Sequence, residues 1–229
     1  MAALMTSFGC SIGGNQMSLF NGKDLDGWKA LRPDNNKWQV AGSVELNPEN
    51  DKQFKINDGE GVLVNGQKGR TSNILSTFQH ADCQLHIEFV VPKDSNSGVY
   101  FQGRYEVQVL DSYGKDEVAF SDCGGIYQRW INNAGLEGHA PRVNAALPPG
   151  QWQSFDVTFQ APRFDASGKK IANARFLKVV HNGKVVHENV ELKGPTRAGL
   201  TGEVARGPLM LQGDHGPVAY RNIRIRPLN

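Results

Sequence analysis

The sequence has few cysteines, little net charge and no long hydrophobic run. Three cysteines in 229 residues are too few for a disulfide scaffold, and without a Cys-x-x-Cys pair we expect no structural zinc site. The formal net charge is only +2, which is not the charge pattern of a protein that binds nucleic acid or an anionic membrane. No apolar stretch approaches the ~20 residues that cross a bilayer. We therefore expect no nucleic-acid partner and no membrane span.

The sequence also lacks a sustained helical period, and short strand patterns take its place. Hydrophobic and polar residues alternate over several segments, which is typical of half-buried strands. The segments are residues 83–91, 105–110, 153–159, 175–180, 184–190, 209–212 and 219–225, with weaker patterns at 61–64 and 73–76. A single all-β domain can reach ~200–250 residues. Many short antiparallel strands separated by Gly and Pro turns predict a jelly-roll sandwich of two antiparallel sheets.

Two connections between these segments carry further information. Asn182-Gly183 lies between two strand patterns and predicts a tight hairpin, because both central residues of a type I′ turn need a positive φ. Residues 112–147 show no regular period, and we expect loops with short strands there. A loop region of that length in a compact domain is usually functional.

The cysteines and the N-terminus leave alternatives open. Cys83 begins a strand pattern and is predicted to be a small buried hydrophobic residue, while a Cys83–Cys123 bridge stays open. We expect residues 1–17 to be a disordered tail or a signal remnant and residues 18–229 to form one domain. Residues 1–14 carry no lysine or arginine and so lack the basic start of a signal peptide. Cys10 follows Gly9, as the lipidated cysteine does at the end of a lipoprotein signal. A lipid anchor on Cys10 is therefore the alternative to a disordered tail.

Candidate chemistry lies at the polar positions of two strand patterns. Alternate residues of a strand lie ~6.6–7 Å apart on one face, a spacing that suits contacts with successive sugar hydroxyls or a pair of carboxylates. An ordinary solvated outer face is the alternative. The residues at these positions or at the strand ends are His86, Glu88, Arg104, Glu106, Gln108 and Asp111.

A histidine and a tryptophan outside the regular strands are further candidates. His215 lies in a turn bounded by Gly213 and Gly216, where it is a candidate general base or metal ligand; a surface loop histidine is the alternative. Trp130 lies in the irregular region and is the tryptophan best placed to stack on a sugar ring. We expect the other three tryptophans in the core, because aromatic side chains supply much of its buried area.

An ordered set of short motifs runs along residues 18–228. The motifs are Leu19-Phe20-Asn21-Gly22-Lys23-Asp24-Leu25-Asp26-Gly27-Trp28, Glu88-Phe89, Asn96-Ser97-Gly98-Val99-Tyr100, Tyr105-Glu106-Val107-Gln108-Val109-Leu110-Asp111, Gly125-Ile126-Tyr127, Gly150-Gln151-Trp152, Asn182-Gly183, Leu211-Gln212, His215-Gly216 and Arg221-Asn222-Ile223-Arg224-Ile225. The set resembles the bacterial 3-keto-disaccharide hydrolase domain family. Two departures are the Gln153 that follows Trp152 in place of the usual Asn, and the turn before His215, which is one residue longer than in many relatives.

The resemblance implies a concanavalin A-like sandwich and a periplasmic or secreted protein that acts on oxidised sugars. The implied chemistry is a hypothesis. A ketone at C3 acidifies the C2 proton, a base removes it, and the enolate expels the group on C1, after which water adds back. Such a site needs a base, an enolate stabiliser and an acid, and a divalent cation is a candidate stabiliser. The rival chemistry is glycoside hydrolysis by two carboxylates.

These observations lead to one site hypothesis, with a carbohydrate as the substrate. We predict that Glu106, His215 and Glu88 are catalytic. We expect Glu106, Gln108 and His215 to converge on one cleft of the concave sheet, with Glu88 and Arg104 near. A non-catalytic lectin-like module on the same sandwich is the alternative function, because fold alone does not decide function. The oligomeric state is left open. The residues predicted to bind substrate are Asn96, Arg104, Gln108, Asp111, Tyr127, Trp130 and Gln212.

Overall fold

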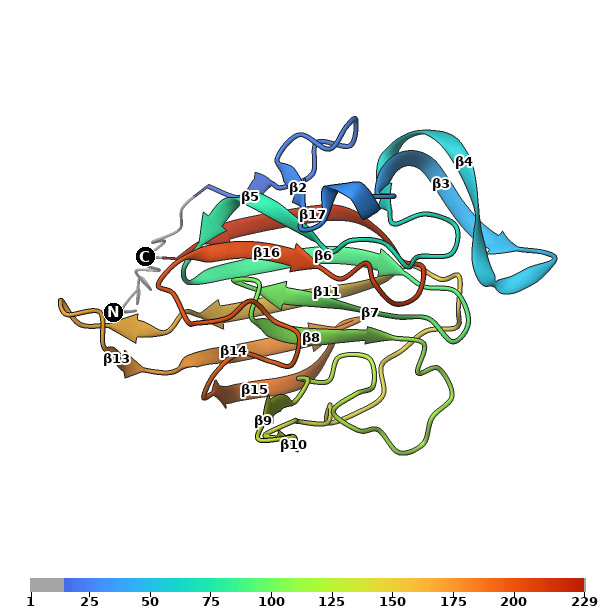
Figure 1. Cartoon of the computed structure of the whole chain (residues 1–229). Coiled ribbons are helices and arrows are strands. Elements are labelled where there is room, and N and C mark those ends of the chain that lie inside the picture. Colours follow the sequence, from blue (N-terminus) through green and yellow to red (C-terminus); the bar gives the residue numbers. More distant parts are fainter. Residues whose placement is uncertain (1–14, 229) are drawn as a thin grey trace, which may run out of the picture.

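Two antiparallel β-sheets packed face to face make up the computed structural model, which describes residues 15–228 (Figure 1). The eight-stranded sheet has the order β15 (Lys184–Leu192), β14 (Ala174–His181), β11 (Gln153–Gln160), β6 (Cys83–Val90), β17 (Ala219–Pro227), β4 (Asn50–Val64) and β3 (Gln39–Asn47), with β1 (Met17–Ser18) paired to β17. The five-stranded sheet has the order β2 (Trp28–Ala30), β5 (Ile74–His80), β16 (Gly207–Leu211), β7 (Asn96–Phe101) and β8 (Tyr105–Leu110). The predicted antiparallel sandwich is confirmed.

Short elements complete the described part of the chain. One two-stranded sheet joins β9 (Arg129–Ile131) to β10 (Ala134–Leu136), and another joins β12 (Arg163–Phe164) to β13 (Lys170–Ala172). The helical content of residues 15–228 is a single 3-10 turn, η1 (Pro33–Asn35). None of these residues forms a helix with the length and hydropathy needed to cross a membrane.

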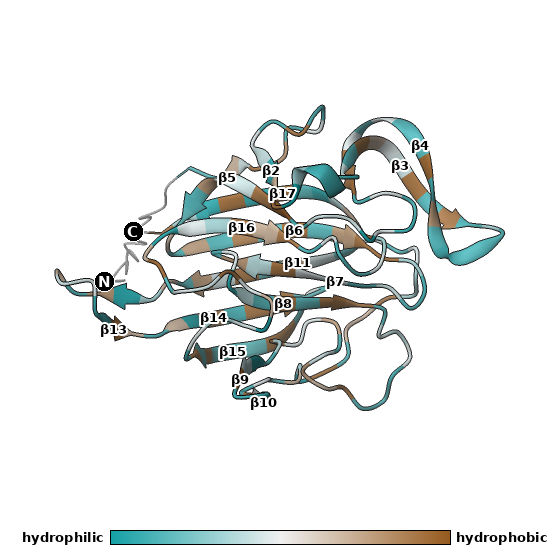
Figure 2. Ribbon diagram, in the orientation of Figure 1, coloured by the Kyte–Doolittle hydropathy of each residue, from teal (hydrophilic) through white to brown (hydrophobic). Residues whose placement is uncertain are grey.

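The core lies between the two sheets and follows the predicted alternation. Tyr105, Val107 and Val109 of β8 are completely buried, and Figure 2 shows hydrophobic and hydrophilic positions alternating along the central strands. The ring of Phe101 on β7 packs against Phe159 on β11 with centroids 5.2 Å apart. Since odd-numbered residues of β8 face the core, the even-numbered residues lie on the outer face of the five-stranded sheet.

A long hairpin, β3–β4, was not fully predicted. The weak pattern at 61–64 is the end of a 15-residue strand, and its partner β3 was missed. Much of the hairpin is exposed and extends beyond the sandwich (Figure 1), so neither face shows a clear alternation. At the N-terminus, Met17 pairs with Ile225, so the sheet begins inside the segment expected to be a tail.

The two described cysteines, Cys83 and Cys123, are both buried and free. The prediction of a buried Cys83 is confirmed, and the Cys83–Cys123 bridge that the sequence left open is not formed. Burial raises the pKa of the Cys123 thiol to about 12, so it is protonated and unreactive at neutral pH. Cys10 lies outside the described residues.

The predicted hairpin turn between β14 and β15 is confirmed. Asn182 and Gly183 have φ values of 48° and 77°. A Cβ atom on Gly183 would meet nothing within 4 Å, so Gly183→Val tests the conformational cost alone. We expect this substitution to lower the free energy of unfolding by about 1 kcal/mol or more, because a β-branched residue resists a left-handed backbone.

The melting temperatures of Gly183→Val and Gly183→Asn, compared with that of the parent, check this expectation. Asparagine tolerates the left-handed region, so Gly183→Asn should stay close to the parent. Equal melting temperatures for the valine variant and the parent would contradict the stated cost.

Three buried histidines make stability sensitive to acid. Burial lowers the pKa values of His80, His181 and His187 to about 4. In the unfolded chain they titrate near 6.5, so between pH 6.5 and 4 the unfolded state binds more protons. The free energy of unfolding should therefore fall as the pH drops through this window, by up to ~1.4 kcal/mol per pH unit for each histidine. Urea unfolding at pH 7 and pH 5 measures it, and equal stabilities at the two values would refute the prediction.

Candidate functional site

A pocket of about 320 Å³ opens on the outer face of the five-stranded sheet. β7 and β8 form its floor, and the turn that follows β16 forms one side. The segment after β8 and a loop near residue 197 form the other side. Its lining residues are Asn96, Tyr100, Glu106, Gln108, Tyr127, Arg197, Ala198, Gln212 and His215.

Glu106 is the buried acid of this pocket. It is opposite Tyr100 in the β7–β8 register, and its side chain lies over Gly98 on the neighbouring strand. A Cβ atom on Gly98 would lie 2.9 Å from Glu106 Cδ and even closer to its Oε1. The missing side chain at position 98 thus provides the space that the Glu106 carboxyl occupies.

The environment of Glu106 keeps its carboxyl protonated at neutral pH. Burial raises the pKa of Glu106 to about 8, while a hydrogen bond from the Tyr100 hydroxyl opposes the shift and the negative charge of Asp214 adds to it. Burial of Tyr100 and the nearby Glu106 also raise the pKa of the Tyr100 hydroxyl well above its ordinary value. A neutral acid with a pKa near the ambient pH can donate a proton and take one back.

His215 lies at the edge of the pocket and is oriented by its neighbour. Its Nδ1 lies 2.7 Å from Asp214 Oδ1. The interaction with His215 lowers the pKa of the Asp214 carboxyl, so Asp214 is a carboxylate at neutral pH. A carboxylate acceptor at Nδ1 holds the proton there and leaves the Nε2 lone pair available as a base.

The amide side chains of the pocket have hydrogen-bonding capacity left for a ligand. Gln108 Nε2 donates to Asn96 Oδ1 at 3.1 Å. Gln212 Oε1 is buried and, among the described residues, has no hydrogen-bond donor. A buried acceptor without a partner is costly, and a ligand hydroxyl would satisfy it.

The structure brings six of the ten predicted residues together around this pocket. They come from β7, β8, the segment after β8 and the turn after β16, and they are Asn96, Glu106, Gln108, Tyr127, Gln212 and His215. The expected faces of Glu106 and Gln108 are right, although both residues are buried rather than open to solvent.

Glu88 does not belong to this group, and its prediction as a neighbour of Glu106 is wrong. It lies on β6 of the other sheet and is opposite Ser154 and Arg221 there. Its carboxyl accepts hydrogen bonds from Arg221 Nε at 2.6 Å and Asn222 Nδ2 at 2.7 Å. Alternation correctly predicts that Glu88 faces away from the core, but the strand is in the opposite sheet, so Glu88 and Glu106 lie on opposite sides of the sandwich.

Arg104 and Asp111 also lie outside the pocket lining. Arg104 precedes β8 in the turn after β7, where the strand alternation does not apply, and its guanidinium donates to the carbonyls of Gln102 and Thr201 at 2.6 and 3.1 Å. Asp111 follows β8 and accepts the Asp94 backbone N–H at 3.0 Å. Both side chains therefore stabilise connections between strands.

Trp130 and three unpredicted residues complete the picture of the site. Trp130 on β9 is 44% exposed and is not among the residues that line the pocket, but the Cζ of the lining residue Arg197 lies 4.2 Å from its indole centroid. Tyr100, Arg197 and Ala198 line the pocket but were not predicted. The sequence alternation could have indicated Tyr100, since it lies between the core residues Val99 and Phe101 and so faces away from the core. The loop that carries Arg197 and Ala198 shows no such alternation.

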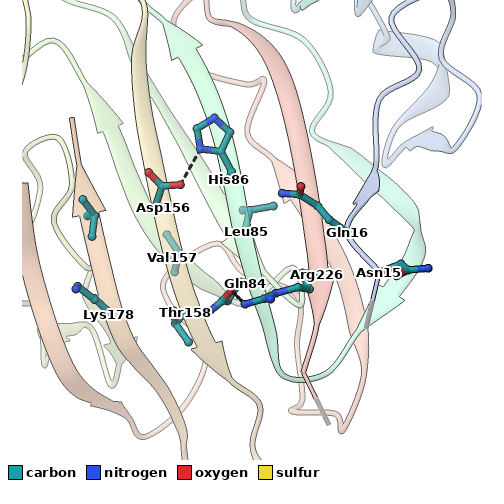
Figure 3. A pocket seen from close by; sticks show the side chains of 11 residues that line it. Asn15, Gln16, Gln84, Leu85, His86, Asp156, Val157, Thr158, Lys178 and Arg226 are labelled. Atoms are coloured by element: carbon teal, nitrogen blue, oxygen red, sulfur yellow. Dashed lines mark hydrogen bonds and ion pairs between the residues drawn. The ribbon is translucent and has the colours of Figure 1, made fainter. Parts of the chain in front are cut away.

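A larger hollow of about 520 Å³ lies on the outer face of the eight-stranded sheet (Figure 3). His86 Nδ1 lies 2.7 Å from Asp156 Oδ1 there, and Arg226 donates to Gln84. The polar side chains of each of these two pairs are thus hydrogen-bonded to one another. The lining of this hollow holds none of the unpaired buried side-chain atoms found in residues 15–228. We therefore take the pocket at Glu106 as the candidate site.

The described residues contain no cluster of three or more His, Cys, Asp and Glu side chains suited to a metal ion. The divalent cation, which the sequence offered only as a candidate enolate stabiliser, therefore has no such cluster to hold it among residues 15–228.

Comparisons with known proteins agree with this architecture. A family model described as a 3-keto-alpha-glucoside-1,2-lyase-like domain matches residues 15–226. No curated protein matches the sequence. A structure of a candidate glycosyl hydrolase from Parabacteroides distasonis ATCC 8503 has 28% identity and a TM-score of 0.64, with 95% of this chain and 84% of that chain covered. A second such structure from the same organism has 19% identity and a TM-score of 0.59, with 93% and 100% covered, and shows the shared fold.

Proposed function

Because the chain belongs to the family of 3-keto-alpha-glucoside-1,2-lyase-like domains, we propose that it is a carbohydrate-active enzyme that cleaves 3-keto-glycosides by eliminating the group on C1. The observation that carries this proposal is the pairing of two different proton-transfer groups in one pocket. Glu106 is a buried neutral acid with a pKa of about 8, and His215 is a histidine bound to a carboxylate at 2.7 Å.

The proposed reaction uses these two groups in sequence. His215 Nε2 takes the proton from C2, and the electron pair of the C–H bond moves to the C3 oxygen to form an enolate. The ketone then re-forms as a double bond develops between C1 and C2. The bond from C1 to the glycosidic oxygen breaks, and Glu106 supplies the proton that this oxygen needs. Addition of water across the new double bond gives the product of net hydrolysis.

The remaining lining residues suit the recognition of a sugar. The amides of Gln108 and Asn96 and the hydroxyl of Tyr127 can hydrogen-bond the ketone oxygen and the ring hydroxyls. Gln212 Oε1, which has no donor among the described residues, would accept a hydrogen bond from a hydroxyl. Neutral donors aimed at the C3 oxygen would stabilise the enolate as its charge develops.

Two alternatives receive less support from the pocket. Hydrolysis by two carboxylates needs an acid and a carboxylate that flank the scissile bond, but Glu106 is the only carboxyl residue among those lining the pocket. A lectin-like module needs no acid with a strongly raised pKa, whereas perturbed pKa values cluster at catalytic sites. Both observations favour proton-transfer catalysis.

The direct test is incubation with a 4-nitrophenyl 3-keto-α-glucoside deuterated at C2. We expect release of nitrophenol, loss of the deuterium to water, and an unsaturated ketone or its hydrate as the sugar product. Aglycone release with the C2 deuterium retained would argue for direct hydrolysis. Binding without any release would favour the lectin-like module.

A further inference from the structure

We propose that Arg197, supported by Trp130, forms a subsite for a carboxylate, so that the substrates are glycosides whose leaving group carries an acidic substituent. The proposal depends on the proposed function only for the identity of the reacting ring. Its evidence is the loop that holds Arg197, the free guanidinium and the charge of the surrounding surface.

The loop that carries Arg197 is held rigidly by backbone hydrogen bonds. Thr196 N–H donates to the Arg104 carbonyl at 2.8 Å, Arg197 N–H donates to the Gln128 carbonyl at 2.9 Å, and Leu200 N–H donates to the Gly103 carbonyl at 2.8 Å. These bonds tie the loop to the β7–β8 turn and to the segment before β9. The backbone position from which the exposed Arg197 side chain extends is therefore set by the scaffold.

The next residue is in a strained conformation. Ala198 has a φ of 63°, a left-handed value that is unfavourable for an L-residue, and it lines the pocket. Backbone strain that the surrounding structure maintains is concentrated at functional sites. Here the left-handed alanine turns the chain immediately after Arg197, at the pocket edge.

The guanidinium of Arg197 is positioned but not neutralised. Its Cζ lies 4.2 Å from the centroid of the Trp130 ring, which fixes the guanidinium plane by a cation–π contact. No carboxylate of residues 15–228 lies within ion-pair distance of it. A fixed planar guanidinium with free N–H groups matches the bidentate geometry of a carboxylate.

The neighbouring charges favour an anion on this side of the pocket. Glu137 is already bonded to two cations, with Arg129 Nη1 at 2.9 Å and Lys193 Nζ at 3.2 Å. Glu191 lies in the same hollow as Glu137 and Lys193 and is paired with Arg175 at 3.2 Å, so each of these carboxylates already has a cation of its own. Glu106 adds no negative charge at neutral pH, because its pKa is about 8.

The subsite lies at the far end of the pocket from the proposed base. β16 pairs with β7, β7 pairs with β8, and Val107 of β8 bridges to Ile126, next to Tyr127. The distance from the end of β16 to the Tyr127 segment is therefore about three interstrand spacings, or roughly 14 Å. A sugar ring beside His215 and Glu106 leaves the Arg197 end for the leaving group.

Binding of two nearly isosteric ligands tests the proposal without catalysis. The probes are 4-carboxyphenyl α-glucoside and 4-carbamoylphenyl α-glucoside, which lack the C3 ketone and cannot undergo the proposed elimination. By calorimetry at low salt, we expect the protein to bind the carboxylate about tenfold more tightly, the lower end for a charge-assisted hydrogen bond. Arg197→Gln should remove this preference, so that the two probes bind equally.

Three further variants define the role of the side chains. Arg197→Lys keeps the charge but not the planar fork and should keep only part of the preference. Trp130→Ala should also weaken it, because the guanidinium loses its support. Arg175→Gln is the matched control on β14, where Arg175 bonds to Asn189 and Glu191, and it should behave like the parent.

The outcomes separate this inference from the proposed function. Equal binding of the two probes, no binding of either, or a preference that survives Arg197→Gln would overturn the carboxylate subsite. If the preference is observed but no 3-keto-glycoside is cleaved, the subsite stands and the proposed reaction fails. If 3-keto-glycosides are cleaved but the protein shows no preference for the carboxylate probe, the proposed reaction stands and the carboxylate subsite fails.

Discussion

Replacing Glu106 with glutamine is expected to lower the cleavage of 3-keto-glycosides by at least ~100-fold, the lower end for loss of a general acid. Glutamine has nearly the same shape and also lacks a charge, so it fills the space over Gly98 without introducing a buried ion. What it loses is the transferable proton. Single-turnover measurement of aglycone release at pH 7 tests this directly, because it isolates the chemical step.

Glu88→Gln is the matched control, since it makes the same change on the opposite sheet and should leave the rate unchanged. The pH profile adds a second readout. Activity of the parent should fall as the pH rises through about 8, where Glu106 loses its proton. An E106Q variant with full activity would remove Glu106 from the mechanism.

The same substitution should affect stability with a defined sign. The pKa of Glu106 is about 8 in the folded protein, against an ordinary value of 4.5, so between these values the folded state binds more protons. The parent should therefore lose up to ~1.4 kcal/mol of unfolding free energy per pH unit as the pH rises through this range. Glu106→Gln removes this dependence, and its stability relative to the parent should increase toward pH 9.

Replacing His215 with alanine should have an effect of similar size, at least ~100-fold on the rate of aglycone release. The variant removes the base that takes the C2 proton, so exchange of the C2 deuterium with water should be lost together with cleavage. Added imidazole should restore part of the rate, because a small base can enter the space left by the side chain. Exchange and cleavage at the parent rate would show that another group is the base.

His86→Ala is a close control for this variant. His86 on β6 has the same contact as His215, with Nδ1 2.7 Å from a carboxylate oxygen, in this case that of Asp156. It lies on the outer face of the other sheet, away from the pocket. Loss of activity in His215→Ala but not in His86→Ala would show that the pocket matters, and not the histidine–carboxylate pair alone.

Most of what could be predicted about the site came from the alternation of hydrophobic and polar residues along the strands. It showed that Glu106 and Gln108 face away from Tyr105, Val107 and Val109, and the structure agrees. The same reasoning failed for Glu88, because alternation indicates the face of a strand but not the sheet that the strand joins. It also failed for Arg104, because this residue lies in the turn before β8, where the alternation of the strand no longer decides which way a side chain faces.

The loop at Arg197 could not have been predicted from the sequence. Its position depends on hydrogen bonds to carbonyls about 70 to 100 residues earlier in the chain, and such distant pairings leave no local pattern. His215 was an intermediate case. The glycines around it indicated a turn, but only the pairing of β16 with β7 placed that turn beside Asn96 and Gly98.

The close approach of Glu106 to Gly98 implies a rule for how this site can vary among related sequences. Position 98 must be glycine wherever an acid occupies position 106 in this way, because a Cβ atom there would lie 2.9 Å from the carboxyl carbon. A relative with a side chain at position 98 must have moved or lost its acid. The two positions should therefore change together, and relatives that lost the pair would be the first place to look for sandwiches of this family that bind sugars without cleaving them.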